Sequence, residues 1–172
     1  MQLVTVNGTS PSVADSCWIA PDVVLVGDIH VGERSSVFYT SVLRADSDRI
    51  TIGSDTNIQD GCIVHADPGI PVKIGSGVSV GHRAVLHGCT IENDVLIGMG
   101  AIILNGAHIG AGSLIAAGAV VLEGTWIPAN SLVAGIPGKV RRQTTPEERA
   151  AIVANAVSYL RLAIANREGL AH

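Results

Sequence analysis

The sequence predicts an all-β solenoid, a parallel β-helix of hexapeptide repeats with a C-terminal α-helix. Aliphatic residues recur every six positions along most of the chain, glycine often follows them, and a helix-capping sequence appears only after this rhythm has stopped. An α-helix repeats every 3.6 residues and an ordinary strand every two, so a sustained period of six fits neither. It fits a β-helix in which each hexapeptide forms one short side and three sides form one coil.

The inward-pointing aliphatic residues form four runs. Along the chain they are Ile19, Leu25, Val31, Val37 and Leu43; Ile52, Ile58 and Val64; Ile74, Val80 and Leu86; and Ile91, Ile97, Ile103, Ile109, Ile115, Val121, Ile127 and Val133. We expect the nine-residue step from Leu43 to Ile52 to be a corner with a three-residue insertion. The ten-residue step from Val64 to Ile74 is expected to carry a four-residue bulge.

We expect a β-helix domain over residues 1–140 and a helical segment over residues 141–172 that packs on it. Residues 1–16 are expected to form a lead-in strand and a turn, so that the coils run over residues 17–133. Residues 134–142 break the rhythm and are expected to leave the prism. The total length suits one domain.

The closing helix has a clear start. Thr145 is the expected N-cap, Pro146 stands at the first helical position, and Glu148 completes a capping box. Gly169 is a plausible stop. The apolar stripe that should pack on the prism consists of Ile152, Ala156, Tyr159, Leu160 and Ala163.

The composition agrees with a narrow prism. The chain is 47% hydrophobic, yet it contains one Phe, two Tyr and two Trp, and such a prism has room for aliphatic side chains but not for aromatic clusters. The net charge of −4 argues against a nucleic-acid partner. The most apolar stretch, residues 99–122, keeps the six-residue rhythm and is therefore expected to be core and not a membrane span.

The expected location is the cytoplasm. The N-terminal residues lack the basic end and long apolar run of a secretory signal. The three cysteines show no pairing pattern and suit a reducing compartment; they are Cys17, Cys62 and Cys89.

Counting on the prism places two histidines together. His65 and His87 are 22 residues apart, and subtracting the four-residue bulge leaves 18, which is one coil. Both directly follow an inward aliphatic residue, so they should stack on one side about 4.8 Å apart. Arg44 should fall on the same side one coil earlier.

A third histidine, His82, belongs to the adjacent side, with Asp60 in the equivalent place one coil below. Because a corner separates His82 from His65 and His87, the three can share one metal only if two subunits meet there. A head-to-tail contact of this kind closes into a ring, for which a trimer is the natural solution. The remaining histidines are interpreted as polar surface residues; they are His30, His108 and His172.

At this point the sequence resembles a known family, the γ-class carbonic anhydrases, from residue 19 through the closing helix. The matching motifs are Arg44-Ala45-Asp46, Asn57-Ile58-Gln59-Asp60-Gly61, His65, and Val80-Gly81-His82-Arg83-Ala84-Val85-Leu86-His87-Gly88-Cys89. The resemblance implies a left-handed β-helix that hydrates CO₂ reversibly to bicarbonate by metal-bound hydroxide. It also implies a homotrimer with metal sites at the subunit interfaces and neither a nucleic-acid nor a membrane partner.

The resemblance assigns roles to individual residues. His65 and His87 would bind the metal from one subunit and His82 from its neighbour. Three neutral imidazoles suit Zn²⁺, and Fe²⁺ or Co²⁺ are alternatives. Gln59 would orient the reacting water, and Asn57 would contact the substrate or water.

Further polar residues are implied around this centre. Arg44 would pair with Asp60 across the subunit boundary, with Asp46 in the same network; a purely structural interface salt bridge is the alternative. Tyr159 would reach the site from the closing helix, unless it only packs there.

One feature departs from the family. Ser47 follows the Arg-Ala-Asp motif where active members carry a glutamate that relays protons, and the short loop over residues 66–69 has no glutamate. CO₂ hydration must export a proton in every turnover, so slow activity is expected, with Asp67 or a buffer molecule as the substitute acceptor.

Three other functions stay open. The first is a metal-dependent acyl-CoA thioesterase. The second is a hexapeptide acyltransferase, which residues 134–139 resemble but which would leave the three histidines unexplained. The third is a non-catalytic assembly subunit that keeps the metal as a structural tie.

Overall fold

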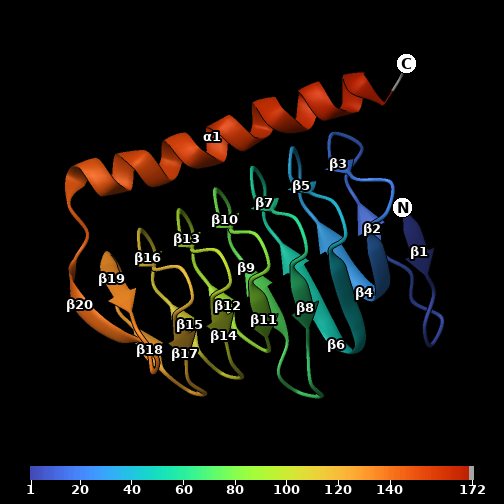
Figure 1. The fold of residues 1–172 in the computed structure, drawn as a ribbon. Coiled ribbons are helices and arrows are strands. Elements are labelled where there is room, and N and C mark those ends of the chain that lie inside the picture. Colours follow the sequence, from blue (N-terminus) through green and yellow to red (C-terminus); the bar gives the residue numbers. More distant parts are fainter. Residues whose placement is uncertain (171–172) are drawn as a thin grey trace.

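The computed structural model describes residues 1–170 and confirms the predicted fold class, a left-handed parallel β-helix with one C-terminal α-helix along its side (Figure 1). Within these residues no helix is both long and apolar enough to cross a membrane. The interpretation of His172 as a surface residue concerns a position outside the described residues.

Short strands stack into three faces. The first face contains β3 (Trp18–Ile19), β5 (Ser36–Val37), β7 (Asn57–Ile58), β10 (Ser79–Val80), β13 (Leu96–Ile97), β16 (Leu114–Ile115), β19 (Ser131–Ala134) and β20 (Lys139–Gln143). The second face contains β1 (Gln2–Val4), the first parts of β4 (Val24–Val31) and β6 (Val42–Ile52), β8 (Ile63–His65), β11 (Val85–His87), β14 (Ile102–Ile103) and β17 (Val120–Val121). The third face contains β2 (Ser12–Val13), the last parts of β4 and β6, β9 (Val72–Ile74), β12 (Thr90–Ile91), β15 (His108–Ile109) and β18 (Trp126–Ile127).

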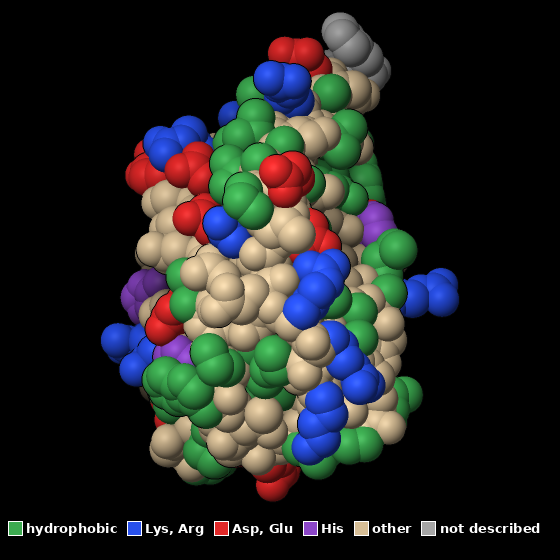
Figure 2. All heavy atoms as spheres, turned by 90° about the vertical axis from the view of Figure 1, so that its left-hand side faces the viewer, with side chains coloured by type: hydrophobic (Ala, Val, Ile, Leu, Met, Phe, Trp, Pro, Cys, Tyr) green, Lys and Arg blue, Asp and Glu red, His purple; other side chains and the backbone are tan. Residues whose placement is uncertain are grey.

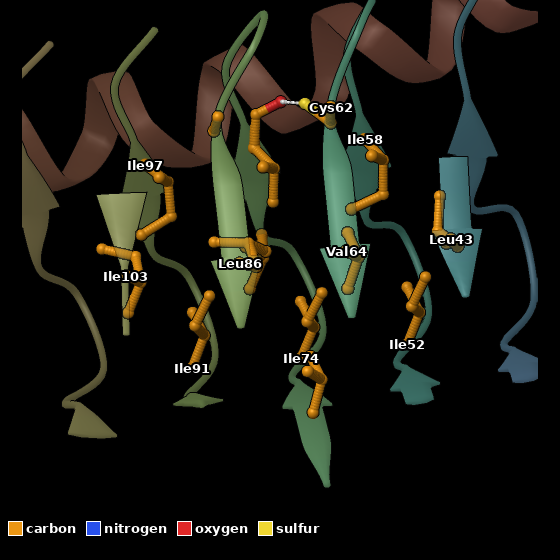
Figure 3. Packing of buried hydrophobic residues seen from close by; sticks show 14 of the residues in the cluster. Leu43, Ile52, Ile58, Cys62, Val64, Ile74, Leu86, Ile91, Ile97 and Ile103 are labelled. Carbon is orange, nitrogen blue, oxygen red and sulfur yellow. Dashed lines mark hydrogen bonds between the residues drawn. The ribbon is translucent and has the colours of Figure 1, made fainter. Parts of the chain in front are cut away.

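The core is a set of aliphatic columns inside the prism. On the second face Leu43, Val64, Leu86 and Ile103 lie above one another and are fully buried, and Figure 3 shows them facing the column of the third face. Each such side chain contributes about 1.5–3 kcal/mol by leaving water. The period of six therefore exists because each hexapeptide places its aliphatic residue in the same column one coil further on.

The stacking predicted by counting is confirmed on the second face. Arg44 is in register with His65, and His65 is in register with His87. The predicted insertion is also present. Residues 46–49 occupy in β6 the place that Asp28 alone occupies in β4, which makes this corner three residues longer.

A uniform coil of 18 residues is wrong in one place. Val80 pairs with Ile97, which is seventeen residues later. The missing residue lies in the corner after Leu86, where Gly88 adopts a φ of +51°. A Cβ on Gly88 would lie 2.4 Å from Oδ1 of Asn105 on the next coil, so the absence of a side chain at this corner leaves room for the Asn105 amide.

Both ends of the β-helix differ from the expectation. β1 and β2 pair in parallel with β4, so the coils begin at Gln2 and not at residue 17. At the other end, β20 folds back antiparallel on β19, so residues 134–142 do not leave the prism and the expected boundary at 140 falls within a strand.

Basic side chains gather on this C-terminal end of the β-helix (Figure 2), where β20 contributes Lys139, Arg141 and Arg142. Charged residues on such an edge strand disfavour pairing with other chains.

The helix α1 (Pro146–Gly169) begins and ends as expected. The hydroxyl of Thr145 accepts from the Glu148 N–H, and the Glu148 carboxylate accepts from the Thr145 N–H at 2.8 Å. The buried residues of α1 belong to the predicted stripe and are Ile152, Ala156 and Ala163. The helix contacts β3, β5, β7 and β10 of the first face.

The cysteines are unpaired in the structure, as expected. Burial raises the pKa of the Cys62 thiol and of the Cys89 thiol to about 12. Both thiols therefore serve as small core side chains and are chemically unreactive at neutral pH.

Replacing Thr145 with Ala should lower the free energy of unfolding by about 1 kcal/mol, because the Glu148 N–H loses the hydroxyl that accepts its hydrogen bond. Urea denaturation followed by circular dichroism measures the change. Thr145→Ser keeps the hydroxyl and should stay close to wild type. Equal losses in the two variants would contradict the role of the hydroxyl.

Candidate metal centre

Three predicted site residues form one column on the outer side of the second face. Arg44, His65 and His87 lie on successive coils in β6, β8 and β11. The imidazole rings of the two histidines have centroids 4.9 Å apart. Nδ1 of His65 lies 2.9 Å from Nε2 of His87, so the two rings point a nitrogen at each other.

Hydrogen bonds on the far side of each ring determine which nitrogen carries the proton. Nε2 of His65 donates to Oδ1 of Asp46 at 3.1 Å, and Nδ1 of His87 donates to Oδ1 of Asn105 at 2.6 Å. The orientation of the Asn105 amide is set in turn, because its Nδ2 donates to Oδ2 of Asp67 at 2.8 Å. In neutral rings the protons therefore lie on the outer nitrogens.

The two nitrogens that face each other consequently both present lone pairs. Lone pairs at a separation of 2.9 Å repel unless a cation lies between them. Two nitrogens bound to one zinc ion at tetrahedral angles lie about 3.3 Å apart, so a small opening of the pair accommodates a metal. An outer hydrogen-bond acceptor on each ring is also the usual arrangement for metal-binding histidines. The residues present therefore fit a divalent metal ion.

Asp67 approaches the same point from the four-residue bulge. Its Oδ1 is 3.9 Å from Nδ1 of His65 and 3.8 Å from Nε2 of His87. The bulge is closed by a bridge between Asp67 and Ile70. Within residues 1–170, the three donor atoms of His65, Asp67 and His87 form the one group of possible metal ligands that lie within 4.8 Å of one another. The sequence indicated Asp67 only as a substitute proton acceptor.

Asn105 was not predicted to belong to the site. The sequence nevertheless carries a signal for it, because the step from Leu86 to Ile91 has five residues, whereas every other step has six or more. This shortening brings Asn105 to the coil position above Gly88, next to His87.

Arg44 and Asp46 form an ion pair beside this pair of histidines. Nη1 of Arg44 donates to both carboxylate oxygens of Asp46, at 2.6 and 2.8 Å. The hydrogen bond from Arg44 and a weaker one from His65 hold the pKa of Asp46 below its usual range. Asp46 therefore stays ionised and can accept a hydrogen bond from the Nε2–H group of His65. Within one chain Arg44 pairs with Asp46 and Asp60 pairs with His82, and the expected pair between Arg44 and Asp60 across the subunit boundary stays a prediction.

His82 lies at the next corner of the prism, outside the group formed by His65, Asp67 and His87. Its Nδ1 is 2.7 Å from Oδ2 of Asp60, and its Nε2 is 3.3 Å from the hydroxyl of Tyr159 on α1. Burial raises the pKa of this tyrosine. The structure therefore confirms the counted positions of His82 and Asp60 and brings Tyr159 to them.

Gln59 and Asn57 support His82 from the first face. Oε1 of Gln59 accepts from the His82 N–H at 3.2 Å, and Nε2 of Gln59 donates to Oδ1 of Asn57 at 3.1 Å. Nδ2 of Asn57 donates to the hydroxyl of Ser79 at 2.9 Å. Both amides are buried, so their bonds keep this corner rigid.

The predicted site residues are thus divided between two half-sites. The second-face half-site consists of Arg44, Asp46, His65, Asp67, His87 and Asn105. The corner half-site consists of Asn57, Gln59, Asp60, His82 and Tyr159.

A groove of about 370 Å³ adjoins the corner half-site, between the first face and α1. Its polar lining residues are Gln59, His82, Tyr159 and Asn155. The rest of the lining is mainly aliphatic and includes Leu96 and Leu114. Mainly apolar pockets with a few polar groups are the usual form of small-molecule sites.

The chain is similar to several known proteins. A family model described as "Bacterial transferase hexapeptide (six repeats)" matches residues 88–123. A Methanocaldococcus jannaschii protein named "Probable carbonic anhydrase" is 55% identical over 144 residues, which cover 84% of this chain and 91% of that protein. "Gamma carbonic anhydrase 3, mitochondrial" of Arabidopsis thaliana is 49% identical over 170 residues, 95% of this chain and 66% of that protein. A solved hexapeptide transferase family protein from Anaplasma phagocytophilum has a TM-score of 0.92 at 37% identity, covering 95% of this chain and 97% of that one.

Proposed function

Because the chain belongs to the γ-class carbonic anhydrase family, we propose that it is a homotrimeric metalloenzyme that converts CO₂ and water reversibly to bicarbonate. The observation that carries this proposal is the pair of inward lone pairs on His65 and His87, each ring held by an outer acceptor. The substrate is CO₂ or bicarbonate, and the place of action is the cytoplasm.

The metal is Zn²⁺, with Fe²⁺ or Co²⁺ as alternatives, since imidazole suits all three. When bound, such an ion lowers the pKa of water to about 7 and so supplies a nucleophile at neutral pH. His65 and His87 hold it from one subunit. Asp46 and Asn105 keep the two rings in the tautomers that binding requires.

An apolar row on the outer side of the second face supports the proposal that a neighbouring subunit packs there. Beside the two histidines this side presents a row of aliphatic side chains that alternate with the inward core residues. The row consists of Val42, Ile63, Val85, Ile102 and Val120. Ile63 is 42% exposed in the single chain. Covering such a row with a neighbouring subunit is favourable because apolar surface leaves water.

Packing the corner half-site of one subunit against this row completes the centre. His82 then supplies the third ligand, and Arg44 pairs with Asp60 of the neighbour while Asp46 stays in the network. Gln59 orients the reacting water, Asn57 contacts substrate or water, and Tyr159 lies beside His82. In the single chain Asp60 orients the His82 ring through Nδ1, and Nε2, now 3.3 Å from the Tyr159 hydroxyl, is the nitrogen that would turn to the metal.

The groove beside His82 favours a second candidate, hydrolysis of acyl-CoA thioesters. A volume of about 370 Å³ exceeds what CO₂ needs and suits an acyl chain. The same metal centre would act on a thioester carbonyl. Hydrolysis of phenylacetyl-CoA by metal-loaded protein that shows no CO₂ hydration would decide for this candidate.

Subunit exchange tests the shared metal centre. His65→Ala and His82→Ala proteins should each be inactive in CO₂ hydration, but mixing them should restore up to about a quarter of the sites, because one interface type in four combines two intact half-sites. Stopped-flow assays on exchanged mixtures measure the recovery. A mixture of His65→Ala with His87→Ala should recover nothing, since both changes damage the same half-site. Absence of recovery in the first mixture, with both variants still trimeric, would contradict a shared centre.

Replacing Gln59 with Ala should lower kcat about 10- to 100-fold and leave the metal content near normal, because Gln59 orients water and His82 but does not hold the ion. Metal analysis and CO₂ hydration on one sample measure both quantities. His87→Ala supplies the comparison for metal loss. A Gln59→Ala protein that loses as much metal as His87→Ala would show that Gln59 has been misassigned.

The absence of a glutamate at Ser47 should make proton export limit turnover. Ser47 is exposed on the corner insertion beside Asp46. We expect kcat to rise with imidazole concentration and kcat/KM to stay constant, because proton export follows bicarbonate release. Ser47→Glu should raise kcat at low buffer concentration. The control is Gln143→Glu, which adds the same charge in β20 at the far end. Saturation of kcat already at low buffer would mean that Asp67 or another group relays the proton.

A further inference from the structure

We propose that a single subunit holds a divalent metal ion before the centre is completed, with Asp67 as the third ligand beside His65 and His87. His82 of a neighbouring subunit then takes over the place of Asp67 in the assembled protein. This proposal rests on the proposed metal centre and adds a ligand and an order of events to it.

The geometry of one chain supports metal binding by His65, Asp67 and His87. The three donor atoms form a triangle with sides of 2.9, 3.9 and 3.8 Å. Three ligands around one tetrahedral zinc ion form a triangle with sides of about 3.3 Å, so the observed sides bracket this value. Two imidazoles and one carboxylate also form a ligand set that proteins use for divalent ions. Movements of a few tenths of an ångström would therefore close the triangle on an ion.

Asn105 aims the carboxylate. It occupies Oδ2 of Asp67 with a hydrogen bond at 2.8 Å and leaves Oδ1 to face the two histidines. The same amide accepts from His87, so one side chain orients two of the three ligands. The bridge between Asp67 and Ile70 holds the backbone of the bulge. The carboxylate is therefore placed by the fold.

The charges around the three ligands also favour a metal ion in the single chain. Asp46 has Arg44 as a cationic partner, whereas the groups within 4.0 Å that pair with Asp67 in the described residues are the two histidines alone. With both rings neutral, the trio has a charge of −1 and no Lys or Arg to offset it. A bound divalent ion offsets this negative charge, leaving a net charge of +1, and lies between the two lone pairs, which relieves their repulsion.

His82 cannot serve as the third ligand within its own chain. It lies outside the convergent group, and its ring nitrogens are in contact with Asp60 and Tyr159. A carboxylate ligand offsets one charge of the ion, whereas three imidazoles leave both. The exchange of Asp67 for His82 would therefore raise the ability of the ion to polarise water only when the interface has formed.

Metal titration of variants tests the proposal. Wild type, His82→Ala and the double variant His82→Ala/Asp67→Asn are stripped of metal and titrated with Co²⁺, followed by its visible absorption and by isothermal titration calorimetry. His82→Ala should still bind one ion per chain, about 10- to 100-fold more weakly than wild type. The double variant should lose this binding and fall to the level of His65→Ala. Asp67→Asn alone should bind within a few-fold of wild type, because His82 is present.

The controls separate this proposal from the metal centre on which it rests. Asp67→Asn keeps the size of the side chain, and circular dichroism verifies that each variant is folded. If His82→Ala binds no better than His65→Ala, or if it binds equally well with and without Asp67, the carboxylate is not a ligand and the proposal is overturned. If wild type itself binds no ion, the proposed centre is overturned and this proposal with it.

Discussion

The structure depends on the stacking of one aliphatic side chain on the next, once per coil. Leu43, Val64, Leu86 and Ile103 occupy one buried column, and the residue after each of the first three is an outward polar side chain. Because the column cannot slip without exposing its members, the outward residues are held in register as well. The closeness of His65 and His87 is thus a by-product of core packing and requires no contact energy of its own.

The same packing explains why the site is divided. A prism side is only two or three residues long, so residues on neighbouring sides point away from each other. His82 is held by Asp60 and Tyr159 at one corner, and the His65–His87 pair is held by Asp46 and Asn105 on the second face. Each part is ordered in the single chain. In the proposed trimer, assembly would bring together two groups that are already oriented, which would keep the entropic cost of completing the centre low.

Counting residues in the sequence was sufficient to predict which side chains lie together wherever the six-residue period held. It placed Arg44, His65 and His87 in one column and His82 above Asp60, because a repeat converts position along the chain into position in space. It was insufficient between Leu86 and Ile91, where a step of five residues shortens one coil and brings in Asn105. It also missed the pairing of β1 and β2 with β4, because Leu3 and Val13 are separated by ten residues and the regular six-residue step begins only at Val13. The orientation of side chains within the bulge, such as Asp67, depends on local hydrogen bonds, which the six-residue repeat does not predict.

The bulge after His65 leaves and rejoins the prism at the same register, since Val64 still pairs with Leu86 and Ile74 still pairs with Ile91. The coils before and after it therefore do not depend on its length. Doubling the length of such a surface loop costs only about 0.6 kcal/mol in closure entropy. The edge of the metal centre can thus be rebuilt by loop grafting, with new carboxylates or aromatic groups, while the scaffold that holds the histidines stays as it is.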